Sequence, residues 1–163
     1  VSRRMILDSL RYWVQHMHVD GFRFDLASAL TRDSEGAPME VPPLIQTINS
    51  DPLLASTTLI AEAWDAAGLY QVGSFPGDRF AEWNGPYRDH GRAFWRGDSH
   101  TIENIMGRIV GSPDLMTAPN EVPSHSINFI TCHDGFCLND LVSYEQKHNL
   151  ENKENNRDGS NQT

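Results

Sequence analysis

The strongest constraint in this sequence is a repeated pattern in which a short apolar segment leads into an acidic residue. The pattern occurs in residues 19–26 with Asp25, residues 57–64 with Glu62, and residues 126–132 followed by Asp134. The first segment alternates between apolar and polar side chains, as a strand does. The other two are short and rich in β-branched or aromatic residues, which also favours strands. The chain therefore contains at least three predicted strands, each close to a carboxylate.

Helical segments lie between these predicted strands. In residues 2–18, Ile6, Leu10 and Val14 recur at the spacing of one helix face, and Ser2 suits the N-cap position. The other predicted elements are a short helix at 44–49, a strand at 79–84, helices at 88–96 and 102–110, and an amphipathic segment around Leu141. This order is typical of an α/β protein with a parallel sheet.

The three carboxylates are candidates for one shared site. Barrels and open α/β sheets place their active sites at the C-terminal ends of parallel strands, where Asp25, Glu62 and Asp134 are expected. Any one of them alone is more often a helix cap or loop residue. Arg23 lies on the same strand face as Asp25, where its positive charge favours an ionised carboxylate. A buried ion pair that only stabilises the fold is the alternative.

Length and charge narrow the classes of function. The chain has 163 residues, fewer than the roughly 250 of a complete (β/α)8 barrel. Its net charge of −9 argues against nucleic acid and anionic membranes as partners, and no apolar run approaches the ~20 residues that span a bilayer. The two cysteines match no zinc or redox spacing. Arg23 beside Asp25 counts against a bound cation, so neither a metal nor a cofactor is expected.

Paired carboxylates on neighbouring strands suit retaining glycoside hydrolysis. One carboxylate attacks the sugar while a second, protonated group releases the leaving group, at a separation of about 5 to 5.5 Å. A third carboxylate stabilises positive charge in the transition state. Trp64 and Trp83 lie at or just past the ends of predicted strands, where flat apolar rings suit pyranose rings, although filling of a loop or core is at least as good an alternative for each.

Three motifs of this chain resemble, in order, those of strands four, five and seven of the α-amylase superfamily. The motifs are residues 21–25 (GFRFD), 60–64 (IAEAW) and 129–134 (FITCHD). The resemblance implies that Asp25 is the nucleophile, Glu62 the general acid/base and Asp134 the transition-state stabiliser, with Arg23 and His133 in substrate binding. Residues 79–89 and 140–144 are similar to the isoamylase and glycogen-debranching subgroup.

The resemblance implies a partial TIM (β/α)8 barrel of about strands four to seven. Residues 1–163 would be the central part of one catalytic domain, incomplete at both ends and inactive in isolation. The implied substrate is a branched α-glucan (glycogen, amylopectin or a limit dextrin) cleaved at its α-1,6 linkages, in the cytoplasm of a bacterium or the plastid of a plant or alga. Ala63 replaces the usual proline, and Leu150, Glu151 and Lys153 depart from the subgroup in a loop that shapes the cleft.

Three alternatives remain open on the sequence. A branching enzyme or glucanotransferase of the same superfamily would use the same carboxylates with a sugar hydroxyl as acceptor. An enolase-type enzyme would use strand-end carboxylates to bind a divalent cation. A non-catalytic relative would bind glucan without cleaving it, although such relatives lose the catalytic carboxylates that this chain retains.

Overall fold

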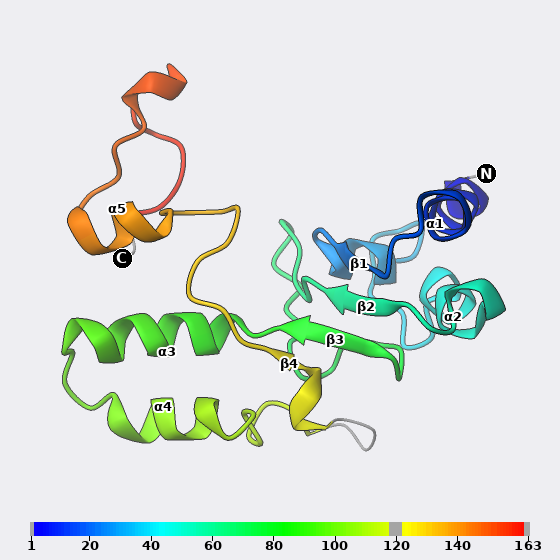
Figure 1. The fold of residues 1–163 in the computed structure, drawn as a ribbon, viewed down its shortest axis with the longest axis horizontal. Coiled ribbons are helices and arrows are strands. Elements are labelled where there is room, and N and C mark those ends of the chain that lie inside the picture. Colours follow the sequence, from blue (N-terminus) through cyan, green and yellow to red (C-terminus); the bar gives the residue numbers. More distant parts are fainter. Residues whose placement is uncertain (1, 118–121, 162–163) are drawn as a thin grey trace. The chain divides into compact units, whose positions relative to one another are not determined.

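The computed structural model describes residues 2–117 and 122–161, which belong to two compact units (Figure 1). The sheet unit comprises Val1–Asn84 and Val110–Ile127, and the helical unit comprises Gly85–Ile109 and Asn128–Thr163. Each unit is described by itself below.

The sheet unit is built on four parallel strands. They are β1 (Gly21–Phe24), β2 (Thr58–Ala61), β3 (Phe80–Trp83) and β4 (Ser126–Ile127), and they lie side by side in that order. In the register, Phe24 pairs with Ala61, and Ala61 pairs with Glu82. The predicted α/β fold with a parallel sheet is confirmed.

One helix of this unit precedes β1, and another lies between β1 and β2. The helix α1 (Ser2–Met17) agrees with the predicted 2–18, and α2 (Pro43–Ser50) begins with proline at its first turn, where no backbone N–H is needed. Three short 3-10 helices complete the unit: Ala27–Thr31, Pro52–Leu54 and Pro123–His125. Among the described residues, no helix is both long and apolar enough to cross a bilayer.

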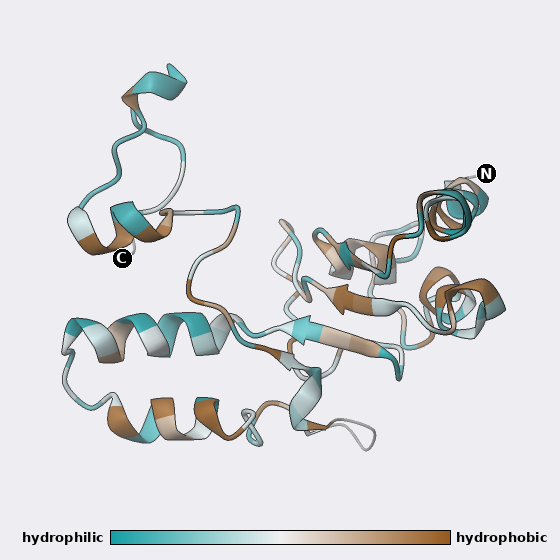
Figure 2. Ribbon diagram, viewed as in Figure 1, coloured by the Kyte–Doolittle hydropathy of each residue, from teal (hydrophilic) through white to brown (hydrophobic). Residues whose placement is uncertain are grey.

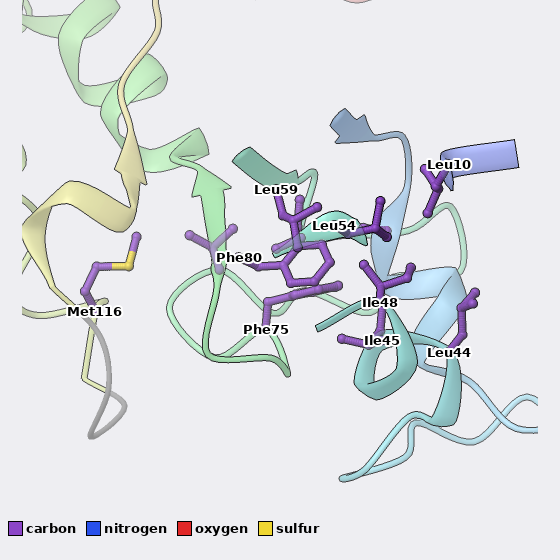
Figure 3. Close-up of a cluster of buried hydrophobic side chains, with 13 residues drawn as sticks. Leu10, Leu44, Ile45, Ile48, Leu54, Leu59, Phe75, Phe80 and Met116 are labelled. Carbon is purple, nitrogen blue, oxygen red and sulfur yellow. The ribbon is translucent and has the colours of Figure 1, made fainter. Parts of the chain in front are cut away.

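The apolar core covers one face of this sheet (Figure 3). Strand alternation places Phe24, Leu59 and Phe80 on the same face, where Phe80 lies 5.5 Å from Phe24 between ring centroids. Ile45 and Ile48 of α2 belong to the same cluster and are almost completely buried. With the apolar side chains on that face, the alternate positions of the strands are free to carry polar ones.

The helical unit contains α3 (Gly85–Arg96), α4 (Ile102–Ile109) and α5 (Leu138–Ser143). The first two form an antiparallel pair, close to the predicted 88–96 and 102–110 (Figure 1). In the described residues from 147 to 161 the chain is irregular, as predicted, apart from a 3-10 turn at Leu150–Asn152.

The predicted strand at 126–132 is wrong in its extent, because β4 ends at Ile127. Its partner β3 ends at Trp83, and the Asn84 N–H donates to the Ile127 carbonyl oxygen at 2.9 Å before α3 begins. No residue of β3 is left to pair with the following segment. Within the helical unit, the Ile130 carbonyl instead accepts hydrogen bonds from the Arg92 side chain at 2.9 and 2.7 Å.

Candidate active site

Asp25 and Glu62 occupy equivalent positions at the ends of two adjacent strands. Asp25 directly follows Phe24, and Glu62 directly follows Ala61. Phe24 and Ala61 are paired with each other in the sheet. The Glu62 N–H donates to the Phe24 carbonyl oxygen at 3.0 Å, so the parallel pairing continues to the level of the carboxylates. The strand-end positions predicted for these two residues are therefore confirmed.

The third strand brings Trp83 to the same level. Because Ala61 pairs with Glu82, the next residue on each strand, Glu62 and Trp83, are also neighbours. Asp25, Glu62 and Trp83 thus form one row across the C-terminal ends of β1, β2 and β3, on the face opposite the apolar core.

Arg23 contacts all three side chains of this row. Its guanidinium lies 2.5 Å from the Asp25 Oδ1, 3.0 Å from the Glu62 Oε1, and 4.2 Å from the centroid of the Trp83 ring. The arginine therefore bridges two carboxylates and stacks on an aromatic ring, which orients the row. The ion pair considered from the sequence exists, and it lies within the candidate site.

The two carboxylates are close together but differently exposed. One oxygen of Asp25 and one of Glu62 lie within 4.8 Å of each other. Such a limit on one pair of oxygens is compatible with the about 5 to 5.5 Å between the carboxyl groups of retaining glycosidases. The Asp25 side chain is 64% exposed and the Glu62 side chain 3%. Asp25 is thus open to an incoming molecule, and Glu62 is enclosed by protein.

The turn after β1 holds Glu62 in place. The Leu26 N–H donates to the Glu62 Oε2 at 2.6 Å, and the Ala27 N–H donates to the Glu62 carbonyl oxygen at 2.9 Å. Leu26 has a left-handed backbone conformation, with φ 42° and ψ 47°. The sequence reasoning missed this residue, because neither its type nor its position indicates such a conformation.

The loop after Glu62 is fixed by an ion pair between Arg32 and Asp65. Their side chains form contacts of 2.6 and 3.3 Å, and Asp65 also accepts the N–H groups of Ala67 and Leu69 at 2.9 and 3.0 Å. The hydrogen bond from Arg32, helped by these two N–H groups, lowers the pKa of Asp65 to about 2. The loop is therefore anchored by a carboxylate that stays ionised over most of the pH range.

Trp64, a predicted substrate-binding residue, lies at the start of this loop. Its ring stacks against Tyr70, with centroids 6.0 Å apart and an interplanar angle of 11°. Tyr70 remains 54% exposed. The loop thus carries a pair of parallel rings two residues after Glu62.

His133 and Asp134 belong to the helical unit. The His133 Nε2 lies 3.6 Å from the Asp134 Oδ2, and both side chains are more than half exposed. Since β4 ends at Ile127, Asp134 does not directly follow a strand as predicted. That His133 and Asp134 meet Asp25 and Glu62 in one site stays a prediction.

Glu82 is a second residue that the sequence reasoning missed. It lies in the middle of β3 on the apolar face, is completely buried, and accepts the N–H groups of Gly73 and Phe75 at 2.5 and 3.1 Å. A charged residue at an apolar position of a strand was the available signal. Glu82 therefore anchors the loop between β2 and β3. It lies on the face of the sheet opposite the candidate site.

The chain is similar in sequence to starch and glycogen debranching proteins, although no family model matches it. It is 50% identical to the chloroplastic isoamylase SU1 of Zea mays, over 99% of this chain and 23% of that protein. It is 54% identical to the glycogen operon protein GlgX homolog of Mycobacterium tuberculosis, over 96% of this chain and 22% of that protein. It is 51% identical to the glycogen debranching enzyme of Erwinia tasmaniensis, over 95% and 23%.

A solved structure supports the same relationship. Pullulanase type I from Bacillus subtilis, in complex with maltose, matches with a TM-score of 0.60 and 26% sequence identity, over 86% of this chain and 21% of that chain. The parallel α/β fold and this match define the class of protein as the α-amylase family. Within that class, the chain belongs to the isoamylase and glycogen-debranching group. It spans about a fifth of the length of the curated relatives it matches.

Proposed function

We propose that the whole protein containing this chain is a retaining glycoside hydrolase that cleaves α-1,6 branch linkages of a glycogen- or starch-type glucan. The observation that carries the proposal is the pair of Asp25 and Glu62, with oxygens within 4.8 Å on adjacent strand ends and Arg23 between them. The names of the relatives, isoamylase and glycogen debranching enzyme, support the α-1,6 specificity. The substrate is a branched α-glucan, and the reaction needs no metal or cofactor.

In the proposed mechanism, one carboxyl group is the nucleophile and the other is the general acid and base. The Asp25 carboxylate attacks the anomeric carbon as the glycosidic C–O bond breaks, and the Glu62 carboxyl group gives its proton to the departing oxygen. Glu62 then removes a proton from water, which attacks the same carbon and releases Asp25. The exposed position of Asp25 supports its role as nucleophile, because that group must reach the sugar.

The remaining candidate residues are proposed to bind the substrate or stabilise the transition state. Trp64 and Trp83 offer aromatic faces to pyranose rings, and Arg23 orients both carboxylates. For His133 and Asp134 the support is their sequence motif, from which we propose that His133 binds a sugar hydroxyl and Asp134 stabilises developing positive charge.

We propose further that residues 1–163 are the central part of one catalytic (β/α)8 barrel, with β1 to β4 as its strands four to seven. The four parallel strands in sequential order support this assignment. The protein is proposed to lie in the plastid if its source is a plant or alga, and in the cytoplasm if its source is a bacterium. Its relatives include both a chloroplastic plant isoamylase and bacterial proteins.

The proposal is tested by Asp25→Asn in the whole protein. Glucan hydrolysis should fall by at least about a thousandfold, because an amide cannot form the covalent intermediate, while glucan binding is largely kept. Asp8→Asn is the matched control, since Asp8 is a similarly exposed carboxylate on α1, 57% against 64%, with ion pairs of its own. Normal turnover by the Asp25 variant would refute the assignment.

The nature of the products separates hydrolysis from transfer. Hydrolysis of branch linkages raises the number of reducing ends, whereas a branching enzyme or glucanotransferase leaves it nearly constant. A constant number of reducing ends during a change in glucan branching would therefore assign the transfer reaction to the same carboxylates.

A further inference from the structure

Leu26 stands in a backbone conformation that a large side chain rarely adopts. Its φ of 42° and ψ of 47° lie in the left-handed region, where the β-carbon of any residue except glycine is crowded. Such conformations cluster at functional sites, where surrounding contacts compensate for the strain. Leu26 follows Asp25, the proposed nucleophile, which places the strained residue next to the reacting group.

Two hydrogen bonds depend on this turn, and both end on Glu62. The Leu26 N–H reaches the side-chain Oε2 at 2.6 Å, and the Ala27 N–H reaches the main-chain oxygen at 2.9 Å. The turn also begins the 3-10 helix Ala27–Thr31, whose Ala29 N–H donates to the Leu26 carbonyl at 2.9 Å. In a regular continuation of the parallel pairing, the Leu26 N–H would donate to the Glu62 main-chain oxygen; because the chain turns here, the Ala27 N–H takes that acceptor and the Leu26 N–H bonds the Glu62 side chain.

We propose that Leu26 is a positioning residue that fixes the Glu62 carboxyl group through its main-chain N–H. A backbone N–H can only donate, so a neutral carboxyl group turns its carbonyl oxygen toward it. The Leu26 N–H thereby gives Oε2 a fixed main-chain donor, while the Arg23 guanidinium lies 3.0 Å from Oε1 at the other side of the carboxyl group. This inference rests on the proposed role of Glu62 as general acid/base.

The leaving group of the substrate distinguishes a positioning role from a structural one. Departure of a sugar alkoxide requires a proton from the general acid, whereas fluoride leaves as an anion without one. A misplaced Glu62 therefore slows cleavage of a branched glucan but spares the first step with α-maltosyl fluoride. A general loss of folded protein lowers both rates in the same proportion.

The variant Leu26→Val applies this test in the whole protein. A β-branched residue resists the left-handed conformation more than leucine does, so the turn shifts together with the N–H groups that it presents to Glu62, and kcat on branched glucan should fall by about tenfold or more. The rate of fluoride release from α-maltosyl fluoride in the first turnover should change by less than about twofold, because fluoride needs no acid. Leu26→Gly keeps the N–H and adopts the turn without strain, and should lose less activity on glucan than Leu26→Val.

His18→Val is the matched control. His18 also has a positive φ, 55°, and is exposed after α1, so valine introduces the same backbone strain away from Glu62. Its effect on the two substrates should be equal. Equal losses on both substrates for Leu26→Val, as for His18→Val, would overturn the inference.

Two further variants separate a failure of the inference about Leu26 from a failure of the proposed function. If Leu26→Val does not fold, replacing the Asp25–Leu26 amide by an ester removes the N–H and leaves the side chain unchanged, with the same expected preference for the fluoride. Glu62→Ala tests the proposed function itself, since loss of the acid must also spare the release of fluoride in the first turnover, although the second step still needs Glu62 as a base. If Glu62→Ala shows that preference and the ester does not, the inference about Leu26 fails while the function stands. If Glu62→Ala loses both substrates equally, the proposed function fails.

Discussion

The sheet unit and the helical unit differ in how far their large apolar side chains are buried. In the sheet unit, several large apolar residues of α2, of the 3-10 helix after it and of the strands are buried against one another, among them Ile45, Ile48, Leu54, Leu59 and Phe80. In the helical unit, many are exposed, among them Trp95 at 81%, Val142 at 77%, Ile109 at 66%, Ile102 at 65% and Met106 at 63%. Figure 2 shows the hydrophobic residues along α4 in brown.

The difference in burial indicates how much buried apolar surface contributes to the stability of each unit. Burial of apolar surface is the main favourable contribution to folding, so the sheet unit stabilises itself and holds Asp25 and Glu62 in a fixed row. In the helical unit, Ile105 and Arg108 of α4 are buried, whereas the adjacent side of that helix carries exposed apolar residues. The geometry of the carboxylate pair therefore depends on the better-packed of the two units.

The largest expected effect is a loss of stability on truncation of the sheet core. Phe80 is 1% exposed and packs against Phe24 and Phe75, so Phe80→Ala should lower the free energy of unfolding by about 3 to 5 kcal/mol. Trp95→Ala in the helical unit should change it by no more than about 0.5 kcal/mol, as for other exposed positions.

Urea denaturation of the whole protein, followed by circular dichroism, measures both variants. A large loss for Trp95→Ala would break the comparison, because it would show that another surface covers this side chain.

The sequence predicts local features of this molecule better than long-range ones. Alternation in residues 19–26 was enough to place Arg23 and Asp25 on the polar face, since it depends only on neighbouring residues. The end of β4 at Ile127 depends on where its partner β3 stops, 44 positions earlier at Trp83. No pattern within residues 126–132 contains that information.

The contacts that orient the candidate site are also long-range. Arg32 and Asp65 are 33 positions apart, and the Leu26 N–H reaches Glu62 across 36. The Leu26 bond comes from the main chain, which is the same in every residue, so residue type gave no signal. Glu82 is buried because the N–H groups of a loop satisfy its charge, and that loop conformation could not be read from the sequence.

A smaller effect on stability is expected when either of two aspartates that pair with an arginine is replaced. One of these aspartates lies in each unit. Asp65 has a side chain 4% exposed, and Asp98, which pairs with Arg96, is 39% exposed. The arginine hydrogen bond lowers the pKa of both carboxyl groups, that of Asp65 to about 2. A lowered pKa in the folded state means that the stabilisation is complete above the ordinary value of 3.8 and is lost as the pH falls toward 2.

Melting temperatures between pH 6 and pH 2 test this pair of residues. Asp65→Asn should lower the melting temperature at pH 6 and flatten its fall below pH 4, and Asp98→Asn should do so less, because solvent screens an exposed pair. Equal pH profiles for the two variants would show that burial does not distinguish the pairs.

The smallest expected effect is a gain in stability at Gly107, in the middle of α4. A β-carbon added there meets no atom within 4 Å, and alanine favours a helix over glycine, so Gly107→Ala should raise the free energy of unfolding by about 0.5 to 1 kcal/mol. Gly97 is the control, because its surroundings are equally open but its φ of 86° strains any other residue, and Gly97→Ala should destabilise. Urea denaturation measures both. A loss of stability for Gly107→Ala would mean that the side of α4 around Gly107 is covered in the whole protein.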